Sequence, residues 1–162
     1  MTVMDRTIKY QFTVRADEME EAKAEVLKCI SDCIVNMEVC NDIMADLDLA
    51  LDEIFMNIVE HSENGNSTFD VCVHVYETKI NIIISDCGFV DVKSKYVKKL
   101  DKNILFNAAR SNRGRGLAMV NHVMDNFEIF KKSKNGRDKG GFIVNMIKNI
   151  PPTCVFSEAM VF

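Results

Sequence analysis

The sequence is short of glycine, proline and tryptophan. Its 162 residues include seven glycines, two prolines and no tryptophan. This composition excludes collagen-like and low-complexity chains, and the length suits one compact domain. A folded chain of this size buries roughly 68–70% of the surface that its unfolded form exposes, so its core needs neither disulfides nor a metal ion.

The few glycines and the charged residues are unevenly distributed. All seven glycines follow residue 64. Residues 1–64 carry 5 lysines and arginines against 15 acidic residues, whereas residues 65–162 carry 15 against 9. The net charge of −4 disfavours tight binding of nucleic acid, whose affinity comes mainly from neutralising phosphates. A local anion site in the basic part of the chain is the better prediction.

Long apolar runs and paired cysteine motifs are also absent. No stretch approaches the ~18 apolar residues of a membrane span, and the first residues do not resemble a signal peptide. The six cysteines form no C-x-x-C pair, which disfavours a zinc or thioredoxin-like site and predicts reduced, buried thiols. We therefore expect a cytoplasmic protein that does not contact the membrane.

Hydrophobic patterning predicts the elements of the first half. Residues 7–15 alternate apolar and polar side chains, as in a half-buried strand. A helix capped by Asp17 should follow and run to about residue 35. A second, longer helix beginning at Asn41 or Asp42 has the clearest apolar repeat, and Gly65 is expected to end it.

The second half predicts a basic loop flanked by strands. Residues 87–113 are rich in lysine and arginine and lack periodicity, so we expect a long mobile loop, typical of a lid. The other predicted elements are strands over residues 67–76 and 79–86, a helix from Gly114 to about Asn126, and strands over residues 127–133 and 141–148. The order of elements predicts an α+β, two-layer α/β sandwich whose mixed or antiparallel sheet is covered by three helices.

Three groups of residues are candidates for a functional site. Glu53 and Asn57 are four residues apart, so they share one face of the long helix. Asp86 and Gly88 end the strand predicted over residues 79–86, where a ligand can approach the backbone closely. The third group opens a predicted helix, whose free N–H groups suit a phosphate: Gly114, Arg115 and Gly116.

In their order and spacing, these three groups resemble the N, G1 and G2 boxes of the GHKL (Bergerat-fold) ATPases, which include histidine-kinase catalytic domains. The segments at residues 50–61 and 114–120 look most like the small bacterial anti-sigma factor/serine-protein kinase branch. The resemblance covers roughly residues 7–148. It implies a single Bergerat-type domain over residues 1–150 with a mixed, mostly antiparallel sheet, an ATP lid over residues 89–113 and an apolar tail over residues 151–162.

The resemblance also implies a role for each candidate residue. Asn57 would bind the Mg²⁺ that bridges the phosphates of ATP, and Glu53 would act as the general base toward a serine hydroxyl. Asp86 would hold the adenine amino group, and Gly88 would let the base approach. The phosphate side would be lined by Gly114, Arg115 and Gly116. Four basic residues of the lid are candidates for a further phosphate contact, and the choice among them stays open: Lys98, Lys99, Arg110 and Arg113.

Two segments depart from the usual family pattern. Gly88 is followed by Phe89-Val90-Asp91 rather than by a second glycine or a Pro-Phe pair, so the turn beneath the adenine must be rebuilt. Phe142 follows Gly140-Gly141 where many relatives have a threonine that helps to bind adenine. A hydroxyl is therefore missing from the predicted adenine pocket.

The function that the resemblance implies is an ATP-dependent protein serine kinase that is also an anti-sigma factor. Its expected partners are a small antagonist protein, which is the substrate in a partner-switching pathway, and a sigma factor. Whether the protein also forms a homodimer is left open. The alternative is a non-catalytic partner-binding module of the same fold. A detached histidine-kinase catalytic domain is less favoured, because no helix with a phosphoacceptor histidine precedes residue 7.

Overall fold

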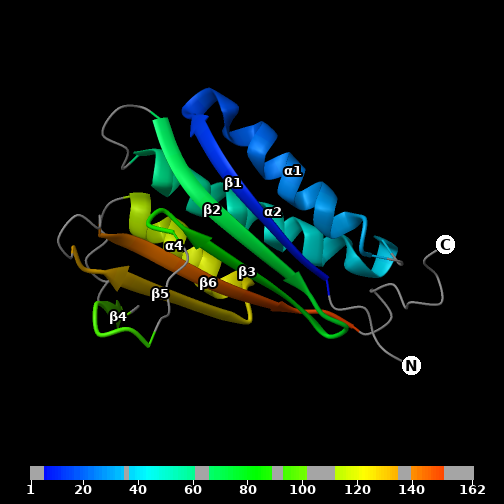
Figure 1. The fold of residues 1–162 in the computed structure, drawn as a ribbon. Coiled ribbons are helices and arrows are strands. Elements are labelled where there is room, and N and C mark those ends of the chain that lie inside the picture. The colour runs from blue at the N-terminus through cyan, green and yellow to red at the C-terminus, as the bar shows by residue number, and fades with distance from the viewer. Residues whose placement is uncertain are drawn as a thin grey trace.

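The computed structural model describes residues 6–34, 37–60, 66–88, 93–101, 112–134 and 140–151, with the backbone alone at residues 37–39, 66 and 112–115. Six strands form one sheet in the order β1-β2-β3-β6-β5-β4 (Figure 1). Their bounds are Arg6–Arg15 (β1), Asn66–Val75 (β2), Lys79–Ser85 (β3), Val97–Lys99 (β4), Asn126–Lys132 (β5) and Gly141–Asn149 (β6). Every described pair is antiparallel, so the sheet is antiparallel rather than mixed.

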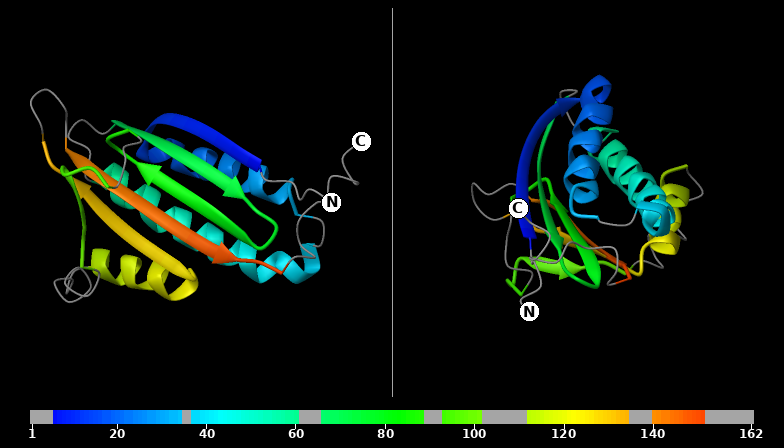
Figure 2. Two further views of the ribbon diagram at one scale, coloured as in Figure 1. Left: turned by 60° about the horizontal axis from the view of Figure 1, so that its bottom comes forward. Right: turned by 90° about the vertical axis from the view of Figure 1, so that its right-hand side faces the viewer.

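Among the described residues, three helices cover one face of the sheet, which makes the domain a two-layer sandwich (Figure 2, right). They are α1 (Met19–Ser31), α2 (Met37–Glu60) and α4 (Asn112–Val123), and the 3₁₀ turn η1 (Ala16–Glu18) leads into α1. The predicted α+β sandwich with three helices is confirmed.

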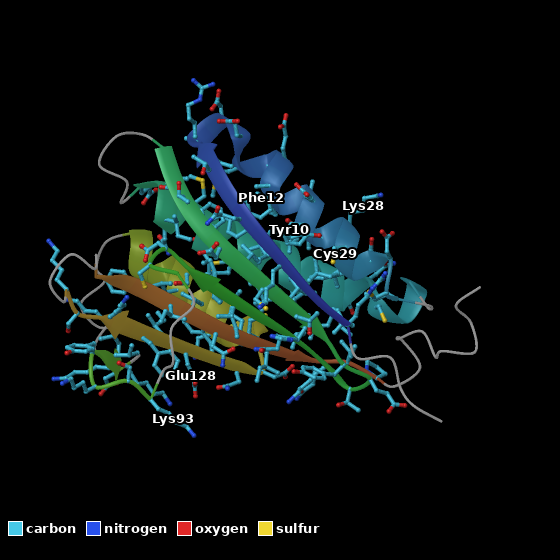
Figure 3. The ribbon with its side chains drawn as sticks, in the orientation of Figure 1. Tyr10, Phe12, Lys28, Cys29, Lys93 and Glu128 are labelled. Atoms are coloured by element: carbon cyan, nitrogen blue, oxygen red, sulfur yellow. The ribbon has the colours of Figure 1, made fainter. Side chains whose placement is uncertain are left out.

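The core lies between the helices and the covered face of the sheet. Tyr10 and Phe12 of β1 lie beside α1 (Figure 3). Phe12 lies 5.6 Å from Phe69 of β2 and 6.4 Å from Phe55 of α2, measured between ring centroids, and Phe55 and Phe69 are 4.9 Å apart. Tilted rings at these separations stabilise packing beyond the area that they bury. This aromatic cluster fixes which face of α2 meets the sheet.

Several predicted helix bounds are wrong by a few residues. Asp17 lies within η1 and makes an ion pair with Arg15 at 3.6 Å, so the N-cap of α1 is Glu18 rather than Asp17. Helix α1 ends at Ser31, before the predicted residue 35. Helix α2 begins earlier than predicted, at Met37, because its apolar pattern continues in the N-terminal direction through the buried Cys40.

The basic segment predicted as one loop contains a short strand. Strand β4 pairs with β5, which places Val97 opposite Lys132, and Val97 packs with Phe130 and Ile143 on the uncovered face of the sheet. Helix α4 begins at Asn112 rather than Gly114 and ends at Val123 rather than near residue 126. The expected stop at Gly65, the rest of the lid and the apolar tail beyond Pro151 lie outside the described residues.

Cys40 is disulfide-bonded, so the prediction of reduced thiols is wrong at this position. Four other cysteines are free: Cys29, Cys33, Cys72 and Cys87. Within the described part of the chain, no helix is long and apolar enough to cross a membrane.

Candidate functional site

Helix α2 presents Glu53 and Asn57 beside its buried face. Phe55, between them in sequence, is 1% exposed and is held by the aromatic cluster. Successive residues of a helix are rotated by about 100°, so Glu53 and Asn57 lie about 100° and 60° to the same side of the buried Ile54, on one flank of the buried face. Both side chains are only partly exposed. The core thus positions a carboxylate and an amide one helical turn apart at the edge of the helical layer.

The carboxylate of Glu53 lies directly against Gly116 of α4. A Cβ atom at position 116 would lie 2.9 Å from Cδ of Glu53 and would overlap its Oε2 atom. Only glycine therefore allows this approach. The contact joins two of the predicted groups, which are more than 60 residues apart in sequence.

The N-terminal turn of α4 lies at the same place. Because α4 begins at Asn112, Gly114 and Arg115 are among its first four residues, whose N–H groups have no acceptor within the helix. These groups and the helix dipole favour an anion, whether a phosphate or the nearby carboxylate of Glu53. Gly116 comes directly after this turn, and the observed neighbour of Gly116 is the carboxylate of Glu53.

Asp86 is tied to the neighbouring strand. Its Oδ1 atom accepts a hydrogen bond from the backbone N–H of Phe142 at 2.8 Å, and its own N–H donates to the Phe142 carbonyl oxygen at 3.3 Å. A Cβ atom at Gly141 would lie 2.8 Å from Cβ of Cys87 and would overlap the Asp86 carboxylate. Asp86 is nevertheless exposed. Its second oxygen therefore has room for a ligand.

The turn after β3 is built around the side chain of Ser85. Its hydroxyl accepts the backbone N–H of Cys87 at 3.2 Å and donates to the carbonyl oxygen of Gly88. Gly88 has φ = +80°, which is the left-handed region that favours glycine. The hydrogen bonds of Ser85 thus hold the chain at Gly88, after which this sequence lacks the family's usual second glycine.

The end of β3 lies at the same end of the domain as the C-terminal half of α2. Ser67, near the start of β2, donates a side-chain hydrogen bond to the carbonyl oxygen of Ile58 at 3.2 Å. Asp70 of β2 is opposite Ser85 of β3. The elements that carry Glu53, Asn57, Asp86 and Gly116 therefore converge on one end of the sandwich, at the left of Figure 1.

The lid candidates are only partly described. Lys99 makes an ion pair with Glu128 at 3.1 Å, and Lys98 is exposed opposite Lys131. Arg110 and the side chain of Arg113 lie outside the described residues, as does His61, one turn beyond Asn57. The residue of the lid that contacts phosphate stays an open prediction.

Sequence reasoning missed two contributors to this site, Ser85 and Gly141. The strand patterns over residues 79–86 and 141–148 assign neither residue a part in the site. The sequence does contain a signal for Gly141: the doublet Gly140-Gly141 stands at the start of β6, and no other residue of this strand is glycine. Such a glycine marks a close approach of another group to the backbone.

These residues fit the groups that an ATP site requires. The amide oxygen of Asn57 is a hard donor of the kind that Mg²⁺ prefers, and a phosphate can meet the free N–H groups of α4. A sequence profile of the histidine kinase-like ATPase domain matches residues 14–148. The chain belongs to this GHKL-type family, and membership implies that the site binds ATP. No curated protein matches the chain in sequence.

Proposed function

We propose that the protein is an ATP-dependent protein serine kinase that also acts as an anti-sigma factor. It would phosphorylate a small antagonist protein and sequester a sigma factor in a bacterial partner-switching pathway. The observation that carries the proposal is the contact between the Glu53 carboxylate and Gly116, which puts a potential base at the end of α4 that favours phosphate.

In this proposal each residue has one task. Mg²⁺, held by Asn57, would supply charge that neutralises the phosphates, on which phosphoryl transfer mainly depends. Glu53 would accept the proton of the attacking serine hydroxyl. Asp86, with one oxygen already bonded to Phe142, would accept a hydrogen bond from the adenine amino group with the other.

Two exposed methionines support a protein partner. Met56 of α2 and Met119 of α4 are 41% and 44% exposed, each three residues from a member of the Glu53–Gly116 contact. Methionine is common at protein-binding surfaces because its flexible, polarizable side chain adapts to different partners. A partner docked on these two helices would bring a serine close to Glu53.

The kinase activity is tested by incubating the protein with Mg-ATP and each candidate antagonist, followed by mass spectrometry for phosphoserine. We expect phosphoserine with the wild type and its loss in Asn57→Ala, because this variant lacks the proposed Mg²⁺ ligand. Met119→Lys should reduce transfer to the protein substrate while ATP still binds. No phosphoserine under conditions in which nucleotide binds would rule out the kinase.

A non-catalytic partner-binding module is the second candidate, and one observation favours it. Phe142 is 46% exposed and stands where the family's threonine contributes a hydroxyl, while its N–H already occupies one oxygen of Asp86. Calorimetry with ATP and with ADP, each with Mg²⁺, separates the candidates. Absence of heat at millimolar nucleotide, with partner capture intact, would favour the module.

A further inference from the structure

Three side chains on the uncovered face of the sheet form a continuous hydrogen-bonded chain. Oγ1 of Thr7 lies 2.9 Å from Nδ1 of His74, and Nε2 of His74 lies 3.3 Å from Sγ of Cys72. Cys72 and His74 are two residues apart on β2, so they point to the same face, and Thr7 is directly opposite His74 on β1. This face is opposite to the helical layer and takes no part in the proposed ATP site.

The separation of sulfur and nitrogen suits a metal ion. Zn²⁺ binds thiolate sulfur at about 2.3 Å and imidazole nitrogen at about 2.0–2.1 Å, so a tetrahedral ion holds the two atoms about 3.5 Å apart. The observed 3.3 Å differs from this value by an amount that a small side-chain rotation covers. A metal ion can therefore replace the hydrogen that now links the two atoms.

The bond to Thr7 leaves Nε2 of the imidazole as the nitrogen available to a metal, and a modest rotation of the ring turns its lone pair from the sulfur toward an ion bound beside both atoms. When Nδ1–H donates to Thr7, the lone pair of Nε2 points at Cys72. Metal-binding histidines almost always have such a partner on their other nitrogen, which fixes the tautomer. Tyr76 adds a second restraint, because its ring stacks on the His74 ring at 6.0 Å and 17°.

The neighbours of Cys72 control access and charge. Cys72 is 4% exposed, and its cross-strand partners are Lys9 of β1 and Ile83 of β3. Burial raises the pKa of the Cys72 thiol, and Lys9 opposes this shift. The thiol is therefore protonated at neutral pH. A bulky reagent has little access to it, whereas a metal ion is small.

We propose that Cys72 and His74 form a binding site for a divalent metal ion of borderline softness, such as Zn²⁺, with Thr7 as the positioning residue of His74. Binding forms an S–metal bond and an N–metal bond and releases the thiol proton to solvent. Among the described residues no cluster of three or more metal-binding side chains occurs, so solvent must complete the coordination. The expected affinity is accordingly weaker than that of a site with three or four protein ligands.

The first experiment titrates the nucleotide-free protein with Zn²⁺ in calorimetry and with Co²⁺ in absorption spectroscopy. The wild type should bind about one ion per chain, release about one proton and give a thiolate-to-cobalt band. Cys72→Ser and His74→Asn should lose this binding. Cys29→Ser is the matched control, because Cys29 is a free thiol that lines a hollow of about 280 Å³ between α1 and the helix-covered side of β1, on the other face of the sheet from Cys72. This variant should bind like the wild type.

Two further variants separate a metal site from a structural hydrogen bond and do not remove either ligand. Thr7→Val keeps the side-chain shape but loses the partner of Nδ1, so metal affinity should fall about 10–100-fold. Lys9→Met removes a cation beside the site, so affinity should rise. Circular dichroism and thermal unfolding of each variant check the fold. No ion bound by a folded wild type, or binding that survives Cys72→Ser, would overturn the proposal.

Discussion

The contact with Glu53 explains why position 116 is a glycine in a chain that has only seven. The position is inside a helix, where alanine is more favourable than glycine by about 1 kcal/mol. Glycine leaves this space to the Glu53 carboxylate, which any larger side chain would displace. The helix thus gives up intrinsic stability so that a potential base can lie against it.

Gly116→Ala is the most direct probe of this contact. The added methyl group should displace the carboxylate, and phosphate transfer should fall by about 10²-fold or more, the usual contribution of a general base. Single-turnover transfer measures the effect, with ADP binding measured in parallel. Ala118→Gly is the control on the same helix: it should lower the melting temperature but keep the activity. Full activity of Gly116→Ala would contradict the assignment.

Gly141→Ala tests the adenine side. Its methyl group would overlap Asp86 and crowd Cys87, which breaks the bond between Asp86 and the Phe142 N–H. A hydrogen bond to a charged group contributes about 1.5–3 kcal/mol, so ADP affinity should fall roughly tenfold or more. Titration calorimetry measures it. Phe142→Thr is the control: it keeps the backbone N–H and should bind ADP at least as well as the wild type. If Gly141→Ala binds ADP as tightly as the wild type, Asp86 has no role in holding adenine.

The individual elements were predicted largely from periodicity. The apolar repeat of α2 and the alternation in β1 predicted these two elements correctly, because each follows from burial of one face. Helix ends were less accurate. Glu18 is the N-cap of α1 without a side-chain hydrogen bond to the helix, so the preference of Asp17 for capping gave the wrong start. Tertiary packing, rather than the local cap, fixes this end.

Lys23 links the first two helices. Its Nζ lies 2.9 Å from Asp48, 3.2 Å from Glu20 and 3.3 Å from Asp52, and its side chain is 12% exposed. Burial alone would lower the pKa of Lys23, but the three carboxylates outweigh it and raise the pKa. The lysine therefore stays charged and holds α1 against α2.

Lys23→Met should reduce the free energy of unfolding by about 1–2 kcal/mol, because it leaves three carboxylates without their shared cation. This loss is small for a charge that contacts three partners, because the three carboxylates are 46–77% exposed and solvent screens their interaction with Lys23. Urea denaturation measures the change. Lys28→Met, at an exposed position of the same helix, should stay within about 0.5 kcal/mol. Equal effects of both substitutions would show that the ion pairs of Lys23 contribute nothing to the free energy of unfolding.

For the whole molecule, the order of elements predicted the fold class, but not the contacts between distant segments. The strand order and the pairing of β4 with β5 depend on packing that no local pattern records. The same is true of the site: sequence spacing selected Glu53, Asn57 and Asp86, whereas the approach of Gly116 and Gly141 to two carboxylates required coordinates. Steric requirements of this kind are non-local.

The fold should lose stability at alkaline pH. Burial raises the pKa of Cys29, Cys72 and Tyr10, so these groups bind their protons more tightly in the folded state. Their contribution is fully present below the unfolded values, about 8.5 for cysteine and 10 for tyrosine, and is lost as pH rises through the folded values. The melting temperature should therefore be flat near pH 7–8 and fall above about pH 8.5. Cys29→Ser should make the initial decline shallower, and a rise in melting temperature toward pH 10 would be inconsistent with these shifts.

The central claim is that Glu53 is the base of an ATP-dependent serine kinase, and two adjacent carboxylates allow a direct test. Glu53 faces Gly116, whereas Asp52 faces Lys23. The decisive measurement is the rate of phosphate transfer from Mg-ATP to the protein substrate in Glu53→Gln and Asp52→Asn, with ADP affinity measured for both. We predict a loss of about 10²-fold or more for Glu53→Gln, with ADP affinity unchanged, and nearly full activity for Asp52→Asn. Retained activity in Glu53→Gln, or an equal loss in both variants, would contradict the account.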